Sequence, residues 1–318
     1  MLQLRISTPA ALTPRVLQAL DDPAVSALAL HQGASLRPVG DVVVADIARE
    51  TANDLITRLH DLGVAREGSL LLDPVDSWLS REGLEAAERA PGSPADSVVW
   101  AQVTHHAYDE AELNWTYSSF LVLATLLAGV AVITHSEILV IGAMVLGPEF
   151  GVLAALALSI VRRRPRLLRT ALRTLVVGFL VAIAVTTLVT LGGHALGWVS
   201  RADIARGQGA LAFIYSPNRW SVAVSVIAGA AGVLSLTSDR IGGLSGVFIS
   251  VTTIPAAGNI AVATALGVWG QVGGSALQLV INMAGMVLAG WVTLLVQQVV
   301  WSRVSARRAR ALGLVSDA

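Results

Sequence analysis

The chain has 318 residues, of which 54% are hydrophobic and 14% are charged, and its mean hydropathy is +0.67. A soluble domain of this length would hardly tolerate such a composition, so the sequence predicts an integral membrane protein. The 22 basic and 22 acidic residues balance, which argues against a nucleic-acid partner, and the lack of cysteine excludes disulfides, thiolate metal sites and cysteine nucleophiles.

The first 75 residues predict a small soluble domain of alternating strands and helices. Strand patterns occupy 2–7, 24–30, 41–47 and 69–73, and helical patterns occupy 11–20 and 50–62. The resulting βαββαβ order is that of a ferredoxin-like α+β domain, which we expect at residues 1–75. Such a domain would bind a ligand, oligomerise or simply stabilise the chain, and the fold does not choose between these roles.

Residues 76–116 predict a linker and a juxtamembrane helix. Prolines and glycine surround a short charged helix (SREGLEAAERA), and a second helix is expected from about 96 to 113, with Asp96 as a possible N-cap. His105 and His106 lie there among carboxylates and suggest a metal or pH-sensing cluster. Adjacent helical positions point about 100° apart, however, so a solvated face is the favoured interpretation.

From Trp115 onward, long uncharged runs predict a transmembrane domain at 117–300 and a basic tail at 301–318. The six predicted spans are 117–134, 138–160, 170–191, 220–237, 244–266 and 276–300. Eleven arginines lie in the regions on the side of the amino terminus, against three in the opposite loops. The positive-inside tendency therefore predicts that both termini are cytoplasmic, in a cytoplasmic (inner) membrane of bacterial type.

Two predicted spans are each interrupted by a Pro-x-x-Gly element, Pro148–Gly151 and Pro255–Gly258, about 107 residues apart. Proline removes a backbone donor and glycine lets the chain leave helical geometry, so both spans are expected to be broken. Non-helical backbone survives at membrane depth only where protein covers it or a polar cavity solvates it. The two breaks therefore mark the candidate site.

The two halves of the membrane region resemble each other. AGV occurs at 128–130 and at 231–233, and VTxLV occurs at 185–189 and at 292–296. Each half contains three predicted spans, so the halves must cross the membrane in opposite senses. The sequence thus predicts an inverted 3+3 repeat with two broken helices.

Polar residues gather around the two breaks. Glu149 is the acidic residue expected well inside a span, where a carboxylate is costly unless it faces a cavity or a partner. It would bind a cation or carry a proton, whereas the N–H groups of half-helix N-termini would bind an anion. The predicted substrate- or ion-binding residues are Pro148, Glu149, Gly151, Thr252, Thr253, Pro255, Gly258, Asn259 and Asn282.

A structural alternative remains open for these residues. The prolines would then only kink packed helices, Glu149 would be hydrogen-bonded between them, and Gln278 and Asn282 would join neighbouring helices. His135 is expected in a solvated outer turn, and Tyr215 in an interfacial aromatic belt.

The run ILVIGAMVLGPEFGVLAALAL at 138–158 resembles the signature of a family of hydrophobic membrane proteins, the domain of unknown function 389. GVFISVTTIPAAGNIAVA at 246–263 resembles its second signature, and the likeness covers about residues 115–300. Common members carry a Pro-Leu-Met-Gly-Pro type sequence after Gly-Ala-Met, whereas Glu149 follows Pro148 here. The resemblance implies a membrane architecture and a subgroup with a GAMVLGPEFG-type motif.

The leading hypothesis is a transporter or channel-like protein for an ion or small solute, with a midplane site between the second and fifth spans. The alternative is a membrane-anchored sensor or scaffold whose ferredoxin-like domain binds a ligand or self-associates. A homo-oligomer in the lipid bilayer is expected in either case. No motif for nucleophilic, metal or acid–base catalysis is recognisable, so neither an enzyme nor a cofactor is expected.

Overall fold

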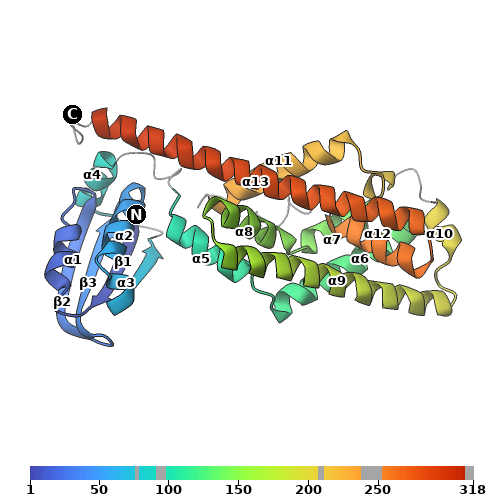
Figure 1. Cartoon of the computed structure of the whole chain (residues 1–318), viewed down its shortest axis with the longest axis horizontal. Helices are drawn as coiled ribbons and strands as arrows, with labels where there is room; N and C mark the ends of the chain where they lie inside the picture. The colour runs from blue at the N-terminus through green and yellow to red at the C-terminus, as the bar shows by residue number, and fades with distance from the viewer. Residues whose placement is uncertain (76–78, 91–97, 207–210, 238–252, 312–318) are drawn as a thin grey trace. The chain divides into compact units, whose positions relative to one another are not determined.

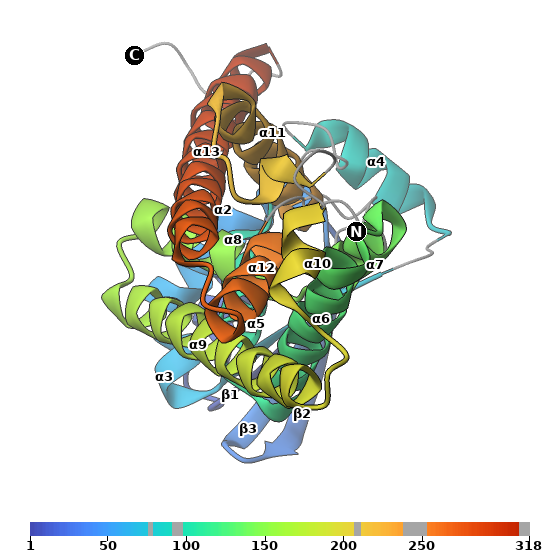
Figure 2. The same ribbon diagram turned by 90° about the vertical axis from the view of Figure 1, so that its right-hand side faces the viewer.

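The computed structural model describes residues 1–75, 79–90, 98–206, 211–237 and 253–311 (Figure 1; Figure 2 gives the perpendicular view). The chain divides into two compact units, Met1–Val103 with Gln298–Ala318, and Thr104–Gln297. The first unit contains a four-stranded sheet, and the second contains most of the apolar helices.

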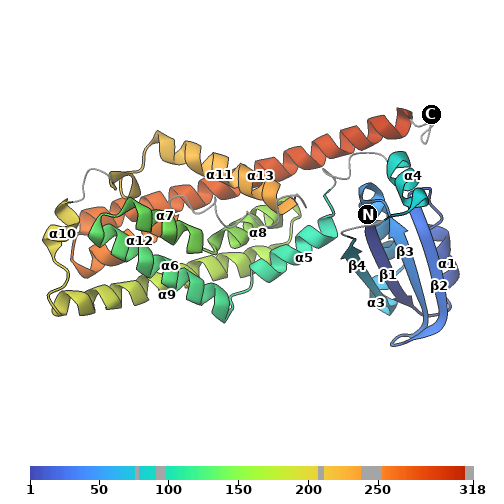
Figure 3. The same ribbon diagram turned by 180° about the vertical axis from the view of Figure 1, so that it is seen from behind.

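The amino-terminal sheet follows the predicted order of strands and helices. Its elements are β1 (Leu2–Thr8), α1 (Thr13–Ala19), β2 (Val25–Leu36), β3 (Val39–Ile47), a 3-10 turn η1 (Arg49–Thr51), α2 (Ala52–Asp61), α3 (Val64–Glu67) and β4 (Ser69–Pro74). The strands lie side by side in the order β2-β3-β1-β4, and every neighbouring pair is antiparallel (Figure 3). Strand β2 runs past its predicted end at residue 30, because it pairs with β3 up to Leu36.

One face of this sheet is covered by helices. Leu2, Leu4 and Ile6 alternate along β1, and each is 0% exposed. They form a core cluster with Val16 of α1 and Leu59 of α2. Burial of such a side chain contributes about 1.5–3 kcal/mol relative to leaving it in water, so the period-two pattern of β1 fixes which face carries the helices.

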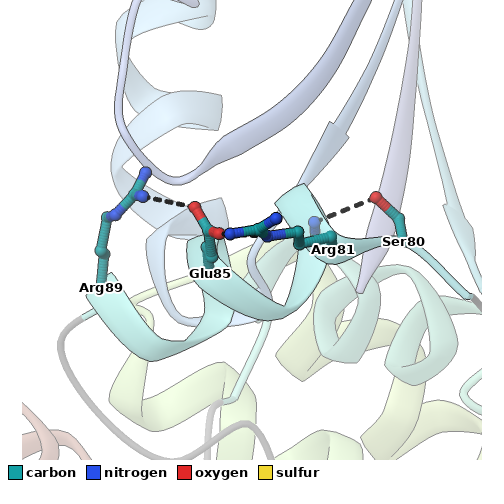
Figure 4. A network of polar contacts seen from close by, with 5 residues as sticks. Ser80, Arg81, Glu85 and Arg89 are labelled. Carbon is teal, nitrogen blue, oxygen red and sulfur yellow. Dashed lines mark hydrogen bonds and ion pairs between the residues drawn. The ribbon is translucent and has the colours of Figure 1, made fainter.

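Helix α4 (Arg81–Arg89) is stabilised by local polar contacts. The Ser80 hydroxyl accepts a hydrogen bond from the Gly83 N–H at 3.1 Å and so caps the helix. Glu85 pairs with Arg81 at 3.1 Å and with Arg89 at 2.7 Å, one turn away on either side (Figure 4). The connector predicted in this region therefore contains the expected charged helix.

The expected juxtamembrane helix is α5 (Trp100–Glu110), and its proposed N-cap, Asp96, lies outside the described residues. His105 is 3.7 Å from Asp109, and their side chains are 83% and 61% exposed. Within the described ranges, no group of three or more His, Asp or Glu side chains is arranged to hold a metal. The solvated interpretation of this face agrees with these exposures.

The second unit is helical. Its elements are α6 (Trp115–Thr134), α7 (Glu137–Leu146), α8 (Glu149–Val161), α9 (Pro165–Ala195), α10 (Arg201–Arg206), η2 (Ala212–Ile214), α11 (Arg219–Thr237), α12 (Thr253–Ala265) and α13 (Trp269–Ala311). Within the described part of the chain, α6, α9, α11 and α13 are long and apolar enough to cross a membrane. The bent pair α7–α8 would be a fifth span. Residues 244–252 of the predicted fifth span lie outside the described residues, so the six-span count stays a prediction.

Helix ends in this unit follow local sequence signals. The Asn114 side chain accepts from the Tyr117 N–H at 2.7 Å and caps α6. His135 ends α6 in the left-handed conformation, and Ser136 then caps α7. Pro165 stands in the first turn of α9, where its missing N–H costs nothing. These signals place the turn between α6 and α7 within a few residues.

Helix α12 packs against both α6 and α9 (Figure 2). Gly258 lies inside α12, and a Cβ there would be 2.6 Å from the Ala128 Cβ and 2.9 Å from the backbone of α6. Gly151 likewise lies inside α8. The expectation that both glycines let the chain leave helical geometry is therefore wrong, since they permit close packing instead.

Candidate functional site

The second predicted span is broken, and the break lies just before Pro148. Helices α7 and α8 meet at an angle of 53°. Gly147 is extended, with φ −70° and ψ 120°, and Pro148 occupies the N-cap position of α8. Proline has no N–H for the helical ladder of α7, so the chain begins a new helix at this point. The first turn of α8 therefore presents backbone N–H groups without helical acceptors.

Glu149 is the first residue of α8, and it is only 1% exposed. Its Oε1 accepts a short hydrogen bond from the Thr253 hydroxyl, which belongs to the first turn of α12. Gly147 makes room for this carboxylate, because a Cβ there would collide with Glu149 Oε2 and lie 2.7 Å from Ile254 Cγ1. The N-terminus of α8 favours a negative charge at this position.

Pro255 stands two residues after Thr253, in the first turn of α12. A proline is tolerated there because it lacks the N–H that a first turn leaves unpaired. The described helix continues from Thr253 through Gly258, so the chain is not broken between Pro255 and Gly258. The expectation of a break at this element is therefore wrong, and Thr252 is outside the described residues.

Tyr117 of α6 is a neighbour of the carboxylate that the sequence did not indicate. Its side chain is 6% exposed. Among the described residues this hydroxyl has no hydrogen-bond partner. Gly178 of α9 gives the ring its place, since a Cβ there would be 2.9 Å from the ring. Among the described residues, Thr253 is thus the hydroxyl that the structure bonds to the Glu149 carboxylate.

A second carboxylate approaches the same helix end. Glu110, at the end of α5, lies against Gly151, and a Cβ at that glycine would be 3.0 Å from Glu110 Cγ. The end of α5 is fixed to α9, because the Thr174 hydroxyl donates to the Ala111 carbonyl at 2.7 Å. Unlike Glu149, Glu110 is exposed. Its position was not predicted, because sequence spacing does not show which helix covers a glycine.

Asn259 lies on a different side of α12 from Thr253. Asn259 follows Thr253 by six helical positions, which places their side chains about 120° apart and about 9 Å apart along the axis. Asn259 is 2% exposed, and its Nδ2 donates to the Ser275 hydroxyl of α13 at 2.8 Å. The structure therefore brings Glu149 and Thr253 together and places Asn259 in a second polar region.

This second region continues along one face of α13. Gln278 donates to the Asn282 side-chain oxygen at 3.5 Å, and both residues are buried. Four polar residues follow the spacing of a single helical face, and all are at most 8% exposed: Gln271, Ser275, Gln278 and Asn282. Only Gln278 and Asn282 were recognised as a pair in the sequence. The i, i+4, i+7, i+11 spacing that begins at Gln271 would also have indicated Gln271 and Ser275.

The apolar helices and the composition of the chain are those of an integral membrane protein. The helical unit also contains a bent helix pair and buried polar groups. Residues 144–288 match the family model described as Domain of unknown function (DUF389). The resemblance expected from the two sequence motifs is thus confirmed over residues 144–288, a segment that includes Glu149, Thr253 and Asn259. Comparisons with curated proteins and with solved structures found no match.

Proposed function

We propose that this protein transports or conducts an ion or small solute through a site between the bent pair α7–α8 and helix α12. The observation that supports this most is the buried Glu149 carboxylate, which accepts from Thr253 where the two helices meet. A carboxylate inside an apolar helix bundle is costly, and such residues usually mark ion or proton pathways. The role of the remaining predicted residues, Pro148, Gly151, Pro255, Gly258 and Asn282, is to shape or extend this site.

We also propose the inverted repeat, and reciprocal packing supports it. The small AGV motif of each half contacts a helix of the other half. Gly129 of α6 lies against Val262 of α12, with 3.3 Å between a Cβ and the valine methyl. Gly232 of α11 lies against the ring of Phe150 in α8. Each half would thus contribute a helix to the core of the other, as inverted repeats around a shared site require.

The same proposal includes six spans, cytoplasmic termini and a bacterial-type inner membrane, which the distribution of arginines favours. The antiparallel order β2-β3-β1-β4 favours a ferredoxin-like domain, through which the chain would form homo-oligomers. The proposed activity is transport without enzymatic chemistry.

The proposal is tested by measuring the flux of ions or small solutes across the membrane of liposomes that contain the purified protein. The variant Glu149→Gln keeps the shape of the side chain and removes its charge, so we expect at least a ten-fold loss of flux. Glu137→Gln is the matched control, because Glu137 lies in the first turn of α7 and is exposed. Equal flux in both variants would remove Glu149 from the mechanism. No flux of any ion or small solute through the unaltered protein would contradict transport itself.

A further inference from the structure

A small polar cavity lies beside α12 and is lined in part by Asn259. Its polar lining comes from His135, Tyr215, Asn259 and Gln271. His135 ends α6, and Tyr215 directly follows η2. Asn259 belongs to α12, and Gln271 belongs to α13. The cavity has room for roughly one water-sized particle. His135 was expected in a solvated turn and Tyr215 in an aromatic belt, but the structure brings both to this cavity.

Two polar atoms at the cavity are buried and lack a hydrogen-bond partner among the described residues. They are His135 Nε2 and Gln271 Oε1. Buried polar atoms of this kind are rare, because leaving one unpaired is costly. Two of them at one cavity of this size indicate that a bound species completes their interactions.

The chemistry of the lining favours a positively charged species. One N–H of the Asn259 amide donates to Ser275, which leaves its carbonyl oxygen and its second N–H. The unpaired atom of Gln271 is also a carbonyl oxygen, and Gln278, two turns further along α13, has another unpaired carbonyl oxygen among the described residues. Amide oxygens can replace the hydration shell of a monovalent cation. An anion would be repelled by them.

The surrounding charge points the same way. Within the described part of Thr104–Gln297, Glu149 is the charged residue that is buried. It lies beside Thr253, about 9 Å from Asn259 along α12. The described residues that line the cavity include no carboxylate, whereas divalent cations usually bind through carboxylates. A single positive charge is therefore the best match.

We propose that the cavity between His135, Asn259 and Gln271 binds one small monovalent cation, held mainly by amide oxygens. That this cation is the transported or coupling ion rests on the proposed function, whereas the binding site itself does not.

Equilibrium binding of radioactive sodium and rubidium to the full chain in detergent tests the site. Gln271→Leu removes the amide and keeps the approximate volume, so we expect at least a ten-fold loss of affinity. Thr125→Val is the matched control, because its 0% exposed hydroxyl bonds only to the Leu121 carbonyl of its own helix at 2.7 Å. Gln271→Glu adds a carboxylate and should bind the cation more tightly than the unaltered protein.

The outcomes separate this inference from the proposed function. Cation binding that depends on Gln271, in a protein without flux, would uphold the site and contradict transport. Flux with no cation binding, or with equal affinity in Gln271→Leu and Thr125→Val, would overturn the site and leave transport standing. Should Gln271→Leu fail to fold, unchanged affinity in Gln271→Glu would overturn it as well. Absence of any cation binding would mean that the cavity holds only water.

Discussion

Glu149 and Thr253 are hydrogen-bonded although 104 residues separate them in the chain. The bond joins the first turn of α8 to the first turn of α12, and both ends are buried. A carboxylate and a hydroxyl thus connect the first turns of two helices that are far apart in the sequence. Disturbing either partner should affect the fold and the proposed site together.

Thr253→Val should lower stability by about 1–3 kcal/mol, because the buried carboxylate loses a donor. Thr253→Ser keeps the hydroxyl and should retain most of the stability. Thr190→Val is the control, since the buried Thr190 hydroxyl bonds to the Thr186 carbonyl of its own helix at 2.8 Å. Thermal unfolding of the detergent-solubilised protein measures the difference. Equal shifts for Thr253→Val and Thr190→Val would show that the bond to Glu149 contributes nothing.

Gly258→Ala should destabilise the packing of α12 on α6 by about 1–3 kcal/mol, because the new methyl group has no space. A Cβ there would be 2.6 Å from the Ala128 Cβ and 2.9 Å from the Gly129 nitrogen. Gly192→Ala in α9 is the control, since its Cβ would meet nothing within 4 Å. That substitution should be neutral or stabilising by up to about 1 kcal/mol. The same thermal assay applies, and an equal response at both glycines would contradict the close approach.

Gly232→Ala should be rescued by a smaller side chain at Phe150. The phenylalanine ring occupies the space that a Cβ at Gly232 would need. Each single change should destabilise, and the double variant Gly232→Ala with Phe150→Leu should recover about 0.5–3 kcal/mol relative to the sum. Strictly additive effects would mean that these residues do not contact each other, which would also weaken the reciprocal packing that supports the repeat.

The amino-terminal domain should lose stability in acid through Asp41. The Thr13 hydroxyl donates to this carboxylate at 2.6 Å and the Gly33 N–H at 2.8 Å. These bonds hold the pKa of Asp41 below its ordinary value. A depressed folded-state pKa stabilises the fold above the unfolded-state pKa, near 3.9. The contribution disappears as the pH falls through the lower folded-state value.

Thr13→Val should raise the pKa of Asp41 towards its ordinary value and lower stability at neutral pH. At a pH below the folded-state pKa the variant and the unaltered protein should differ much less, because the carboxyl group is then protonated in both. Urea unfolding between about pH 2 and pH 7, followed by circular dichroism, measures this. A stability difference that does not change with pH would exclude the carboxylate as its cause.

Periodicity predicted most of the elements that the structure contains. The alternation of Leu2, Leu4 and Ile6 identified β1, and long uncharged runs identified α6, α9, α11 and α13. The predicted end of β2 was wrong. The strand continues to Leu36 through residues of low strand propensity, because it pairs with β3 there. Pairing is a tertiary effect, and a local pattern does not contain it.

The candidate site was predicted in part. Glu149 and Thr253 do meet, and Pro148 does begin a new helix. Asn259 was assigned to the same group, although its position on α12 points about 120° away from Thr253. That separation follows from helical geometry and could have been predicted from the sequence. The positions of Tyr117 and His135 could not be predicted, because they depend on how α6 packs against its neighbours.

The bend between α7 and α8 has a rotational consequence. In one continuous helix, each residue is rotated by about 100° from the one before it. The direction in which the Glu149 side chain points would then be fixed by the orientation of the residues from Glu137 onward. The extended Gly147 and the following Pro148 interrupt this regular rotation, so the orientation of α8 about its own axis does not follow from that of α7. The face that α7 presents to its neighbours and the face on which Glu149 meets Thr253 can therefore vary independently. A substitution that restored a continuous helix would turn the carboxylate away from Thr253 while Thr253 itself stayed unchanged.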